Sequence, residues 1–396
     1  MRFISLIPCS IKQAFALSSI LLLTACTSIT DLKTDISERM FGREVADMEP
    51  LGEIKATANA QVLWQSKLGD AEHYELSPAI EAGFAYIASA AGELAKLDVS
   101  NGNQVWRANV GEKVTGGVGV GGGLVLVGSQ RGVLYAYDLS GKLQWLSRLS
   151  SEILSAPRYF DGTVIVRTGD SRIYGINADD GSRKWVYDRT NPALVLRSSA
   201  GVVVDGGAVY AGFAGGKLAA IRADNGKTLW EASVAQPKGV TEIERIADIT
   251  SLPVVDGPLV YAVAYQGRVA AVDRATGRVV WNRDISSLTG MNMAETRIFI
   301  SHAIGSVYAL DYSTGKTFWR QGALKNRQLT APLPVADFIA VGDVEGYVHF
   351  LSREDGAFAS RIKTGTSAVL PQMALLNSST LLAQSRDGGV YAIQIK

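Results

Sequence analysis

One short pattern recurs along the chain and constrains its fold more than any other feature. In the stretch ALDYSTGKTFW (residues 309–319), Asp311 is followed by Gly315 and Trp319 and is preceded by Gly305. The same frame recurs at 92–106, 132–145, 171–185, 216–230, 267–281 and 346–360, and a shorter copy lies at 388–396. A supersecondary unit of about 40 residues that repeats in this way is typical of solenoids and propellers.

The pattern also predicts the structure inside each unit. Alternating stretches such as VYAL and LAAI indicate a strand that leads into the Asp. The Asp and the Gly then predict a hairpin turn, because the carboxylate accepts turn amides and Gly supplies a positive φ. A second strand ends in Trp, and two more short apolar strands precede each copy. We therefore expect an all-β, eight-bladed β-propeller of four-stranded antiparallel blades.

The two ends of the repeat region complement each other. The eighth copy stops before its outermost strand, whereas an unmatched strand, QVLWQSKL (61–68), precedes the first copy and contains Trp64. Pairing this strand (about 61–68) with the C-terminal strand (about 389–396) would complete blade eight and remove a free sheet edge. The propeller is thus predicted to span residues 61–396.

The tryptophans occupy equivalent positions in the repeat. A residue that recurs in successive blades serves something that each blade does, and a wide ring buries enough surface to wedge two blades together. A cofactor site would have to break the symmetry. We predict a structural, inter-blade role for Trp64, Trp106, Trp145, Trp185, Trp230, Trp281 and Trp319.

The N-terminus predicts export and lipidation. Arg2 and Lys12 accompany the apolar run AFALSSILLL (14–23), which is too short to cross a bilayer and fits a signal peptide. The following LTAC (23–26) resembles the bacterial lipoprotein box. We expect a lipoprotein signal peptide at 1–25, acyl chains such as palmitate on Cys26, and a flexible tether at 26–60 before the propeller.

The cysteines and the residue after Cys26 make the predicted location more specific. The only other cysteine, Cys9, lies in the signal peptide, so no disulfide is expected in the mature chain. In lipoproteins an Asp after the lipidated Cys usually retains the protein at the inner membrane, and here Thr27 takes that position. We expect a protein anchored by its lipid to the periplasmic face of the outer membrane of a Gram-negative bacterium.

Charge and motif spacing argue against several function classes. The chain has 39 Lys and Arg against 38 Asp and Glu, so no basic face for nucleic acid is expected. The GKT of the repeat lacks the Gly that a phosphate loop needs, because position 310 is Leu. The three histidines, His73, His302 and His349, fall in different blades without ligand spacing, so no metal is expected.

The repeat is interrupted at two places. Trp-to-Trp spacings lie near 40 residues except for 45 before Trp230 and 51 before Trp281. The extra residues fall in 186–200 and 231–253, two loops of the same type that should emerge side by side on one face. Apolar anchors beside Arg with a polar rim indicate a protein interface. The alternative is that the leucines tuck under the loop and the charges are solvated. The candidate partner-binding residues are Leu194, Leu196, Arg197, Glu242, Arg245 and Asp248.

The repeat A-x-D-x-x-T-G-K-x-x-W resembles the tryptophan-docking motif of pyrroloquinoline-quinone dehydrogenases. Those enzymes often have a vicinal cysteine pair and acidic and amide ligands for calcium, whereas this propeller contains no cysteine. The resemblance therefore covers the scaffold, and we expect neither a cofactor nor enzyme activity. A quinone-dependent dehydrogenase-like propeller and a generic periplasmic ligand-binding scaffold remain as alternatives.

Taken together, the lipoprotein box, the tether and the propeller resemble the BamB family of the outer-membrane β-barrel assembly machinery. The more specific stretches are LVLRSSA (194–200), TEIERIADI (241–249), VGDVEGYVHF (341–350) and DGGVYAI (387–393). The resemblance implies a non-enzymatic scaffold, monomeric within a hetero-complex, that assists folding and insertion of β-barrel proteins.

The resemblance also implies a partner and a site. The two loops would bind the periplasmic POTRA domains of BamA, with Leu194, Leu196 and Arg197 matching the L-x-L-R element and Asp248 matching an acidic element. The second acid of the family falls on Thr250, which is a departure. Unfolded outer-membrane β-barrel substrates would be further candidate partners.

Overall fold

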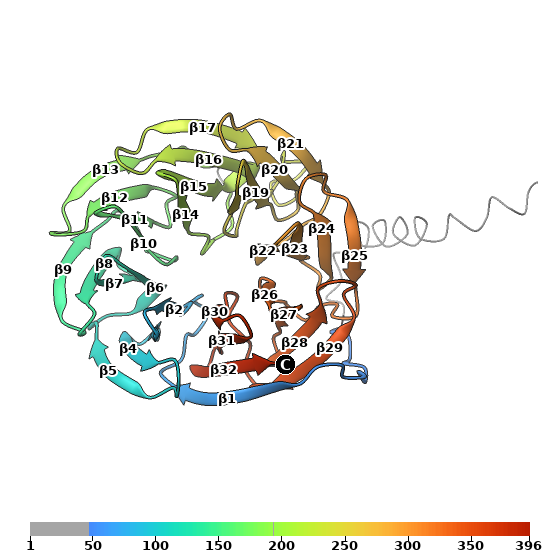
Figure 1. Ribbon diagram of the computed structural model, residues 1–396. Helices are drawn as coiled ribbons and strands as arrows, with labels where there is room; N and C mark the ends of the chain where they lie inside the picture. The colour runs from blue at the N-terminus through green and yellow to red at the C-terminus, as the bar shows by residue number, and fades with distance from the viewer. Residues whose placement is uncertain (1–46, 193) are drawn as a thin grey trace, which may run out of the picture. The chain divides into compact units, whose positions relative to one another are not determined.

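The computed structural model describes residues 47–192 and 194–396, so the predicted signal peptide and Cys26 lie outside the described residues. Residues 49–396 form eight four-stranded antiparallel sheets arranged in a ring (Figure 1). The prediction of an eight-bladed β-propeller is therefore confirmed. Among the described residues the only helical element is a single 3₁₀ turn, η1 (Ala214–Gly216).

Each blade consists of four strands that follow one another in the sequence from the centre of the ring to its rim, except in blade 8. Blades 1 to 4 comprise β2 (Ala79–Glu81), β3 (Phe84–Ala88), β4 (Glu93–Asp98), β5 (Gln104–Asn109); β6 (Val114–Gly121), β7 (Leu124–Ser129), β8 (Val133–Asp138), β9 (Leu143–Arg148); β10 (Arg158–Phe160), β11 (Thr163–Arg167), β12 (Ile173–Asn177), β13 (Arg183–Tyr187); and β14 (Val202–Asp205), β15 (Ala208–Phe213), β16 (Lys217–Arg222), β17 (Thr228–Ser233).

The remaining blades follow in chain order around the ring. Blades 5 to 8 comprise β18 (Val254–Asp256), β19 (Leu259–Val263), β20 (Val269–Asp273), β21 (Val279–Arg283); β22 (Gly290–Ala294), β23 (Arg297–Ser301), β24 (Val307–Asp311), β25 (Thr317–Gln321); β26 (Leu333–Val335), β27 (Phe338–Gly342), β28 (Tyr347–Ser352), β29 (Phe358–Lys363); and β30 (Ala374–Asn377), β31 (Thr380–Gln384), β32 (Gly389–Ile395), β1 (Ala60–Lys67).

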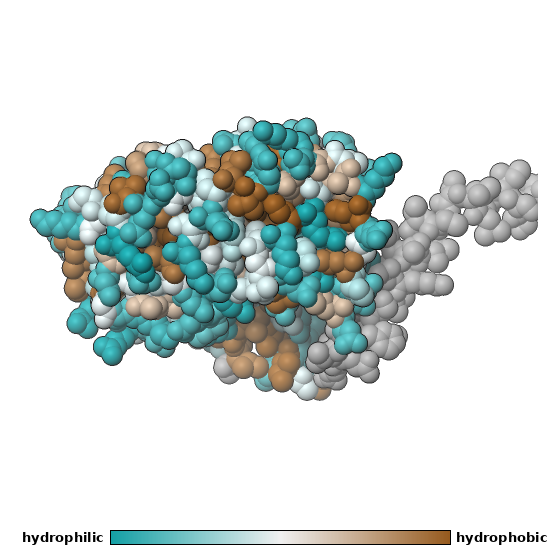
Figure 2. Space-filling model, turned by 90° about the horizontal axis from the view of Figure 1, so that it is seen from below, coloured by the Kyte–Doolittle hydropathy of each residue, from teal (hydrophilic) through white to brown (hydrophobic). Residues whose placement is uncertain are grey.

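The hydrophobic core is divided among the blade interfaces. Middle strands are apolar on both faces because a neighbouring blade covers each face; all five residues of β11, for example, are buried. The outermost strands alternate, and the residue before the Trp is exposed in several of them, such as Leu63, Val105 and Leu229. Seen from the side, apolar side chains on the rim therefore lie in small groups among hydrophilic ones (Figure 2).

The chain ends close the ring as predicted. Strand β1 pairs antiparallel with β32 from Ala60 opposite Ile395 to Lys67 opposite Gly389. Beyond the strands, Asn59 and Lys396 exchange backbone hydrogen bonds of 2.8 and 3.0 Å. Blade 8 is thus completed from both ends of the described chain, which leaves no gap in the ring.

The Gly of the repeat lies in the turn between the two outer strands of blades 1 to 7, and an Asp begins this turn in blades 1, 2, 5 and 6. In blade 6 the Asp311 carboxylate accepts hydrogen bonds from the amides of Ser313 (3.1 Å) and Thr314 (2.8 Å). The next turn residue, Gly315, has φ of 69° and lies under Trp281 of blade 5. The turn therefore also forms the seat for a side chain of the preceding blade.

The tryptophans connect neighbouring blades through this seat. The indole of Trp281 donates from Nε1 to the carbonyl of Tyr312 in the next blade (3.0 Å). The other six tryptophans make the same contact with the following turn, donating to the carbonyls of Val99, Leu139, Ala178, Ala223, Arg274 and Arg353.

Replacing Gly315 by Ala should destabilise the propeller more than a positive φ alone explains. A Cβ at Gly315 would lie 2.6 Å from Cε3 of Trp281, whereas Gly162 has the same φ of 69° and open space around its Cβ position. We expect Gly162→Ala to cost about 1 kcal/mol and Gly315→Ala about 1–3 kcal/mol more, since the indole must shift. Urea denaturation of the two variants measures the difference in their free energies of unfolding. Equal losses of stability would contradict the proposed contact between the turn glycine and the indole.

Candidate functional site

The two longest connections between blades lie against each other. Loop A (residues 188–201) joins β13 to β14, and loop B (residues 234–253) joins β17 to β18. The amide of Leu196 donates to Oδ2 of Asp248 (2.8 Å), and the Ser198 hydroxyl donates to the carbonyl of Thr250 (3.4 Å). The two insertions identified from the spacing therefore form one continuous surface above blades 3 to 5.

Asp248 is a buried residue of loop B that connects the two loops. Only 4% of the residue is exposed, and its second oxygen, Oδ1, accepts a hydrogen bond from the Gly215 amide (2.9 Å). The sequence groups Asp248 with residues that contact a partner. In the structure both of its oxygens are engaged within the chain, so its geometry suits a positioning residue.

A buried arginine fixes the other end of loop A. Arg167, at the end of β11, is 8% exposed and donates from Nη1 to the carbonyls of Ala200 (3.0 Å) and Gly212 (2.7 Å). Burial lowers the pKa of Arg167 to about 10, while the charge of Asp248 acts in the opposite direction. The guanidinium therefore stays charged at neutral pH, which strengthens its hydrogen bonds to the loop.

Arg197 projects from loop A toward a neighbouring loop. Its Nε and Nη2 donate to the two oxygens of Glu152 (3.0 and 2.7 Å), and its guanidinium lies 5.6 Å from the centre of the Tyr74 ring. The hydrogen bond from Arg197 holds the pKa of Glu152 below its usual range. The pair is thus intact at neutral pH and is lost only as pH falls through that lowered pKa. Because 47% of the Arg197 side chain is exposed, this pair contributes little stability and the guanidinium is accessible.

Apolar side chains accompany Arg197 on loop A. Leu194 and Val195 are 43% and 37% exposed, and Leu196 is half-buried. The alternative in which both leucines tuck under the loop therefore does not describe Leu194. Next to the loop, Ser199 donates its hydroxyl to Glu75. Loop A is held at Leu196, Arg197, Ser199 and Ala200 while Leu194 and Val195 remain in solvent.

The tip of loop B is a single turn with its own capping interactions. The Glu244 amide donates to Oγ1 of Thr241 (3.2 Å), and Oε2 of Glu244 accepts from the amides of Val240 (2.9 Å) and Thr241 (3.2 Å). This reciprocal arrangement is a capping box. It leaves Val240 and Ile243 exposed by 94% and 67%. The sequence did not single out these two residues, because TEIER reads as polar and nothing in it shows which way Ile243 points.

The predicted charges of loop B are at this tip. Arg245 and Glu242 are 3.6 Å apart with side chains 55% and 67% exposed, and Nε of Arg245 donates to the Gly239 carbonyl (3.3 Å). Thr250, where the family resemblance predicts an acid, donates its hydroxyl to the carbonyl of Leu288 (2.9 Å). A carboxylate could not make that bond, so the substitution attaches loop B to the next connection, where Leu288 is 43% exposed.

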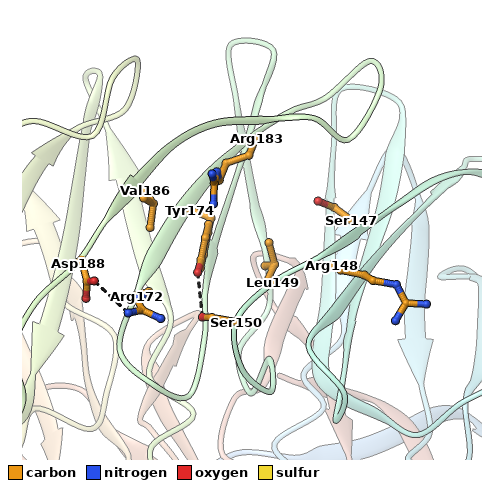
Figure 3. Close-up of a pocket in the computed structure, with 9 residues that line it drawn as sticks. All are labelled: Ser147, Arg148, Leu149, Ser150, Arg172, Tyr174, Arg183, Val186 and Asp188. Atoms are coloured by element: carbon orange, nitrogen blue, oxygen red, sulfur yellow. Dashed lines mark hydrogen bonds and ion pairs between the residues drawn. The ribbon is translucent and has the colours of Figure 1, made fainter.

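An open groove of about 650 Å³ borders loop A between blades 2 and 3 (Figure 3). Arg172 forms ion pairs with Asp188 (3.1 Å) and Asp170 (3.0 Å). Figure 3 shows Tyr174 directed toward Ser150, whose Oγ accepts its hydroxyl at 2.8 Å. Asn191 of loop A donates to the carbonyl of Asp170 (3.2 Å), so the groove wall supports the base of the loop.

Metal-ligating clusters and helices of membrane-spanning character are both absent from residues 47–192 and 194–396. No group of three or more His, Cys, Asp and Glu residues among them is arranged to hold a metal ion. In the same part of the chain, no helix has the length and apolar character needed to cross a membrane.

Eight closed blades with a repeated Asp-Gly-Trp turn define the class of eight-bladed propellers built from quinoprotein-type repeats. Within this class, the family model described as outer membrane protein assembly factor BamB matches residues 50–115 and 90–321. The outer membrane protein assembly factor BamB of Nitrosomonas eutropha is 38% identical over 385 residues, which cover 96% of this chain and 94% of the relative. The chain belongs to the BamB family.

Solved structures agree with this assignment. The crystal structure of BamB from Moraxella catarrhalis matches with a TM-score of 0.79 at 29% identity, covering 85% of this chain and 100% of that one. The quinohemoprotein alcohol dehydrogenase of Comamonas testosteroni matches with a TM-score of 0.70 at 14% identity, covering 85% of this chain and 76% of the enzyme. At that identity the likeness to the dehydrogenase concerns the fold alone.

Proposed function

We propose that this protein is an outer membrane protein assembly factor that acts as a docking scaffold without enzyme chemistry. Loops A and B form its docking surface, and the POTRA domains of BamA are the partner. The observation that carries the proposal is the contrast within loop A. Its backbone and the side chains of Arg197 and Ser199 are held by four neighbouring groups, Asp248, Arg167, Glu152 and Glu75, while Leu194 and Val195 remain exposed.

This contrast favours binding for a physical reason. A loop that is already ordered loses little conformational entropy when a partner arrives, so more of the contact energy appears as affinity. The aliphatic residues of loop A and the tip of loop B supply apolar anchors, and Arg197, Glu242 and Arg245 supply a charged rim. A partner surface with an apolar depression and an acid facing Arg197 would complement it.

In this proposal the residues of the surface have different roles. Leu194, Leu196 and Arg197 contact the partner directly, and Val240 and Ile243 extend the contact at the tip of loop B. Asp248 acts through the loop, because its carboxylate binds the Leu196 amide. Arg197 can leave Glu152 for an acid on the partner, since exchanging one exposed ion pair for another costs little.

The proposed absence of chemistry rests on how the repeat uses its polar residues. The Asp of the turn binds turn amides, the Gly forms a seat, and the Trp donates to the next blade. The Trp contact recurs at seven blade interfaces, and the Asp contact recurs in blades 1, 2, 5 and 6, so the fold itself engages these residues. No quinone or calcium is assigned to this chain, and it is proposed to act as one copy within a hetero-complex.

The proposed cellular location depends on residues outside the part of the chain that the structure describes. The LTAC motif supports lipid attachment at Cys26 after removal of the signal peptide 1–25, and Thr27 supports the outer membrane. The family name of the relatives refers to outer membrane protein assembly as well. The propeller would then act on the periplasmic face of that membrane.

Site-specific photo-cross-linking tests the docking surface in membranes. A photo-reactive residue at position 194 or 245 should cross-link to BamA, because both side chains are exposed on the proposed surface. The matched control is position 278, which is exposed in the β20–β21 turn on the opposite face and should give no such product. Cross-links from 194 and 245 to other proteins, with none to BamA, would contradict the proposed partner.

A further inference from the structure

The segment before the closing strand is bound to the propeller at both of its ends. We call residues 49–59 the strap. The Glu49 amide donates to the carbonyl of Lys325 (3.0 Å) at the loop between blades 6 and 7. At the other end, the amides of Thr57 and Ala58 both donate to the carbonyl of Ala359 in β29 (2.9 and 3.1 Å). The sequence assigns these residues to the flexible tether because they show no strand periodicity, yet their backbone is bound to blade 7.

The end of the strap lies at the one blade interface that has no tryptophan. In blade 7 the Trp position is Ser360, next to the carbonyl that accepts from the strap. Every other outer strand inserts its Trp onto the turn of the following blade. Blade 8 has no such turn, because the ends of β32 and β1 meet there instead. Ala58 packs against the core cluster between blades 7 and 8, so the strap fills the place that a wedge occupies elsewhere.

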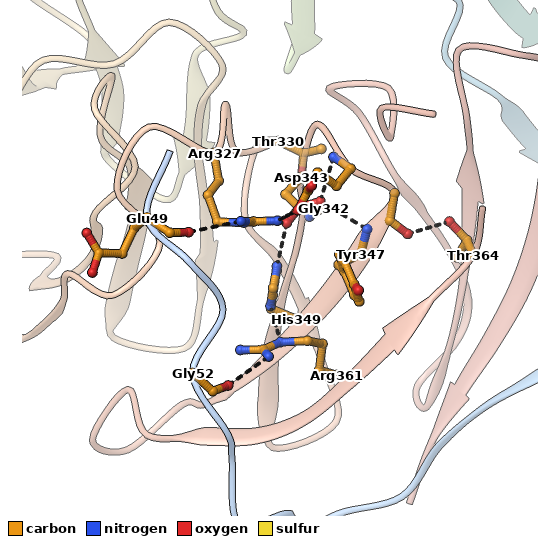
Figure 4. Close-up of polar contacts among 12 residues, drawn as sticks. Glu49, Gly52, Arg327, Thr330, Gly342, Asp343, Tyr347, His349, Arg361 and Thr364 are labelled. Carbon is orange, nitrogen blue, oxygen red and sulfur yellow. Dashed lines mark hydrogen bonds and ion pairs between the residues drawn. The ribbon is translucent and has the colours of Figure 1, made fainter. Parts of the chain in front are cut away.

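A buried arginine binds the beginning of the strap (Figure 4). Arg327 and Asp343 are 1% and 0% exposed, and Nε of Arg327 donates to Oδ2 of Asp343 (2.7 Å). A second group of the same guanidinium, Nη2, donates to Glu345. The third, Nη1, donates to the carbonyl of Glu49 (3.0 Å). The buried guanidinium therefore binds two carboxylates through two of its nitrogens and the strap through the third.

A second arginine is oriented through a histidine. Nε of Arg361 donates to Nδ1 of His349 (3.0 Å), and Nε2 of His349 lies 3.0 Å from Oδ2 of Asp343. Because an arginine Nε–H can only donate, Nδ1 must accept and the proton must sit on Nε2. The imidazole is therefore neutral, and burial, which lowers the pKa of His349, favours that state. Held in this way, Arg361 donates from Nη1 to the carbonyl of Gly52 (3.1 Å).

We propose that Arg327 and Arg361 clip the strap to blade 7. The strap is then part of the propeller, and the predicted tether ends at residue 48 instead of residue 60. The strap is bound at blade 7, whereas loops A and B join blades 3 to 5 of the ring (Figure 1). The strap itself requires no partner. Its consequence rests on the proposed function: a strap held at blade 7 does not cover loops A and B and leaves the docking surface open.

Limited trypsin digestion of the purified mature protein tests the clip. Lys55 is exposed in the middle of the strap, and cleavage after it requires the strap to detach. Arg361→Met removes the donor to Gly52, and Leu51→Ser removes the apolar contact of the strap with the core between blades 6 and 7. We expect each change to accelerate cleavage after Lys55 by at least about tenfold, as loss of a hydrogen bond to a charged group would give. Lys363→Met, two residues along the same strand, is the matched control and should cleave at the wild-type rate, since the Lys363 ammonium lies over Tyr347.

Cleavage after Lys238 in loop B serves as an internal reference and should not change, and thermal melting verifies that each variant is folded. Hydrogen exchange at the amides of Thr57, Ala58 and Asn59 should accelerate in parallel. Wild-type rates in both Arg361→Met and Leu51→Ser would overturn the proposal. Leu51→Ser changes no residue of the network formed by Arg327, Asp343, His349 and Arg361. It therefore still tests the proposal if Arg361→Met does not fold. The assay contains no BamA, so its outcome is independent of the docking surface.

Discussion

The double variant Arg197→Glu with Leu196→Ala is expected to abolish co-purification with BamA. The change replaces an accessible guanidinium by a carboxylate beside Glu152 and shortens the half-buried leucine next to it. Interface arginines and apolar anchors commonly each carry about 2 kcal/mol or more, so affinity should fall by roughly a hundredfold or more. The measurement is capture of BamA from solubilised membranes, followed by titration with its purified periplasmic domains.

The effect should be confined to binding. Arg197 is exposed, Leu196 is only half-buried, and the Leu196 amide keeps its bond to Asp248, so thermal unfolding should stay close to that of the wild type. Arg278→Glu makes the same charge change on the opposite face and should leave capture intact. If the double variant captures BamA as well as the wild type does, the assignment of loop A is wrong.

Asp248→Ala separates direct contact from positioning. This variant should also lose capture, but through the loop, since its carboxylate binds the amides of Leu196 and Gly215. Hydrogen exchange in residues 194–200 should therefore accelerate in Asp248→Ala and stay slow in the double variant. Slow exchange in Asp248→Ala together with lost capture would instead indicate that Asp248 contacts the partner.

The fold could be predicted from the sequence because its information is local and repeated. One turn with Asp311, Gly315 and Trp319 gives the period, and the period gives the number of blades. Even the ring closure follows, because the unmatched strand with Trp64 complements the incomplete last copy. What a repeat cannot predict is the irregular segment outside it. The sequence assigns the strap to the tether, although Ser360 in place of Trp indicates that another group occupies that interface.

The position of the docking surface could be predicted from the sequence, but the contacts that hold its loops could not. The spacing found loops A and B because an insertion lengthens the period. The groups that hold loop A pair with residues far away in the chain, such as Glu152 with Arg197 and Glu75 with Ser199, and no spacing marks such pairs. The burial of Asp248 could not be predicted either, because nothing in the sequence distinguishes it from an exposed loop acid. Its two hydrogen bonds within the chain are evident only in the structure.

The largest loss of stability is expected from Arg327→Met. This change leaves Asp343, which is 0% exposed, without its cationic partner and removes the donor to the strap. Removing one partner of a buried ion pair typically costs about 3–5 kcal/mol, because the other charge remains desolvated. Urea denaturation at pH 7 measures this loss, with Arg278→Met as an exposed control that should change stability by no more than about 0.5 kcal/mol.

The dependence on pH identifies the cause of that loss. In the wild type, hydrogen bonds from His349, Tyr347 and Arg327 outweigh burial, so the pKa of Asp343 lies below its ordinary value. A carboxylate with a lowered pKa stabilises the fold above its unfolded pKa and loses that contribution as pH falls through the folded value. The gap between wild type and Arg327→Met should therefore narrow in acid, as Asp343 becomes protonated first in the variant. The double variant Arg327→Met with Asp343→Asn, which removes the unpaired charge, should recover part of the loss at pH 7. A gap that stays constant with pH and a double variant no more stable than the single one would mean that Arg327 acts by packing alone.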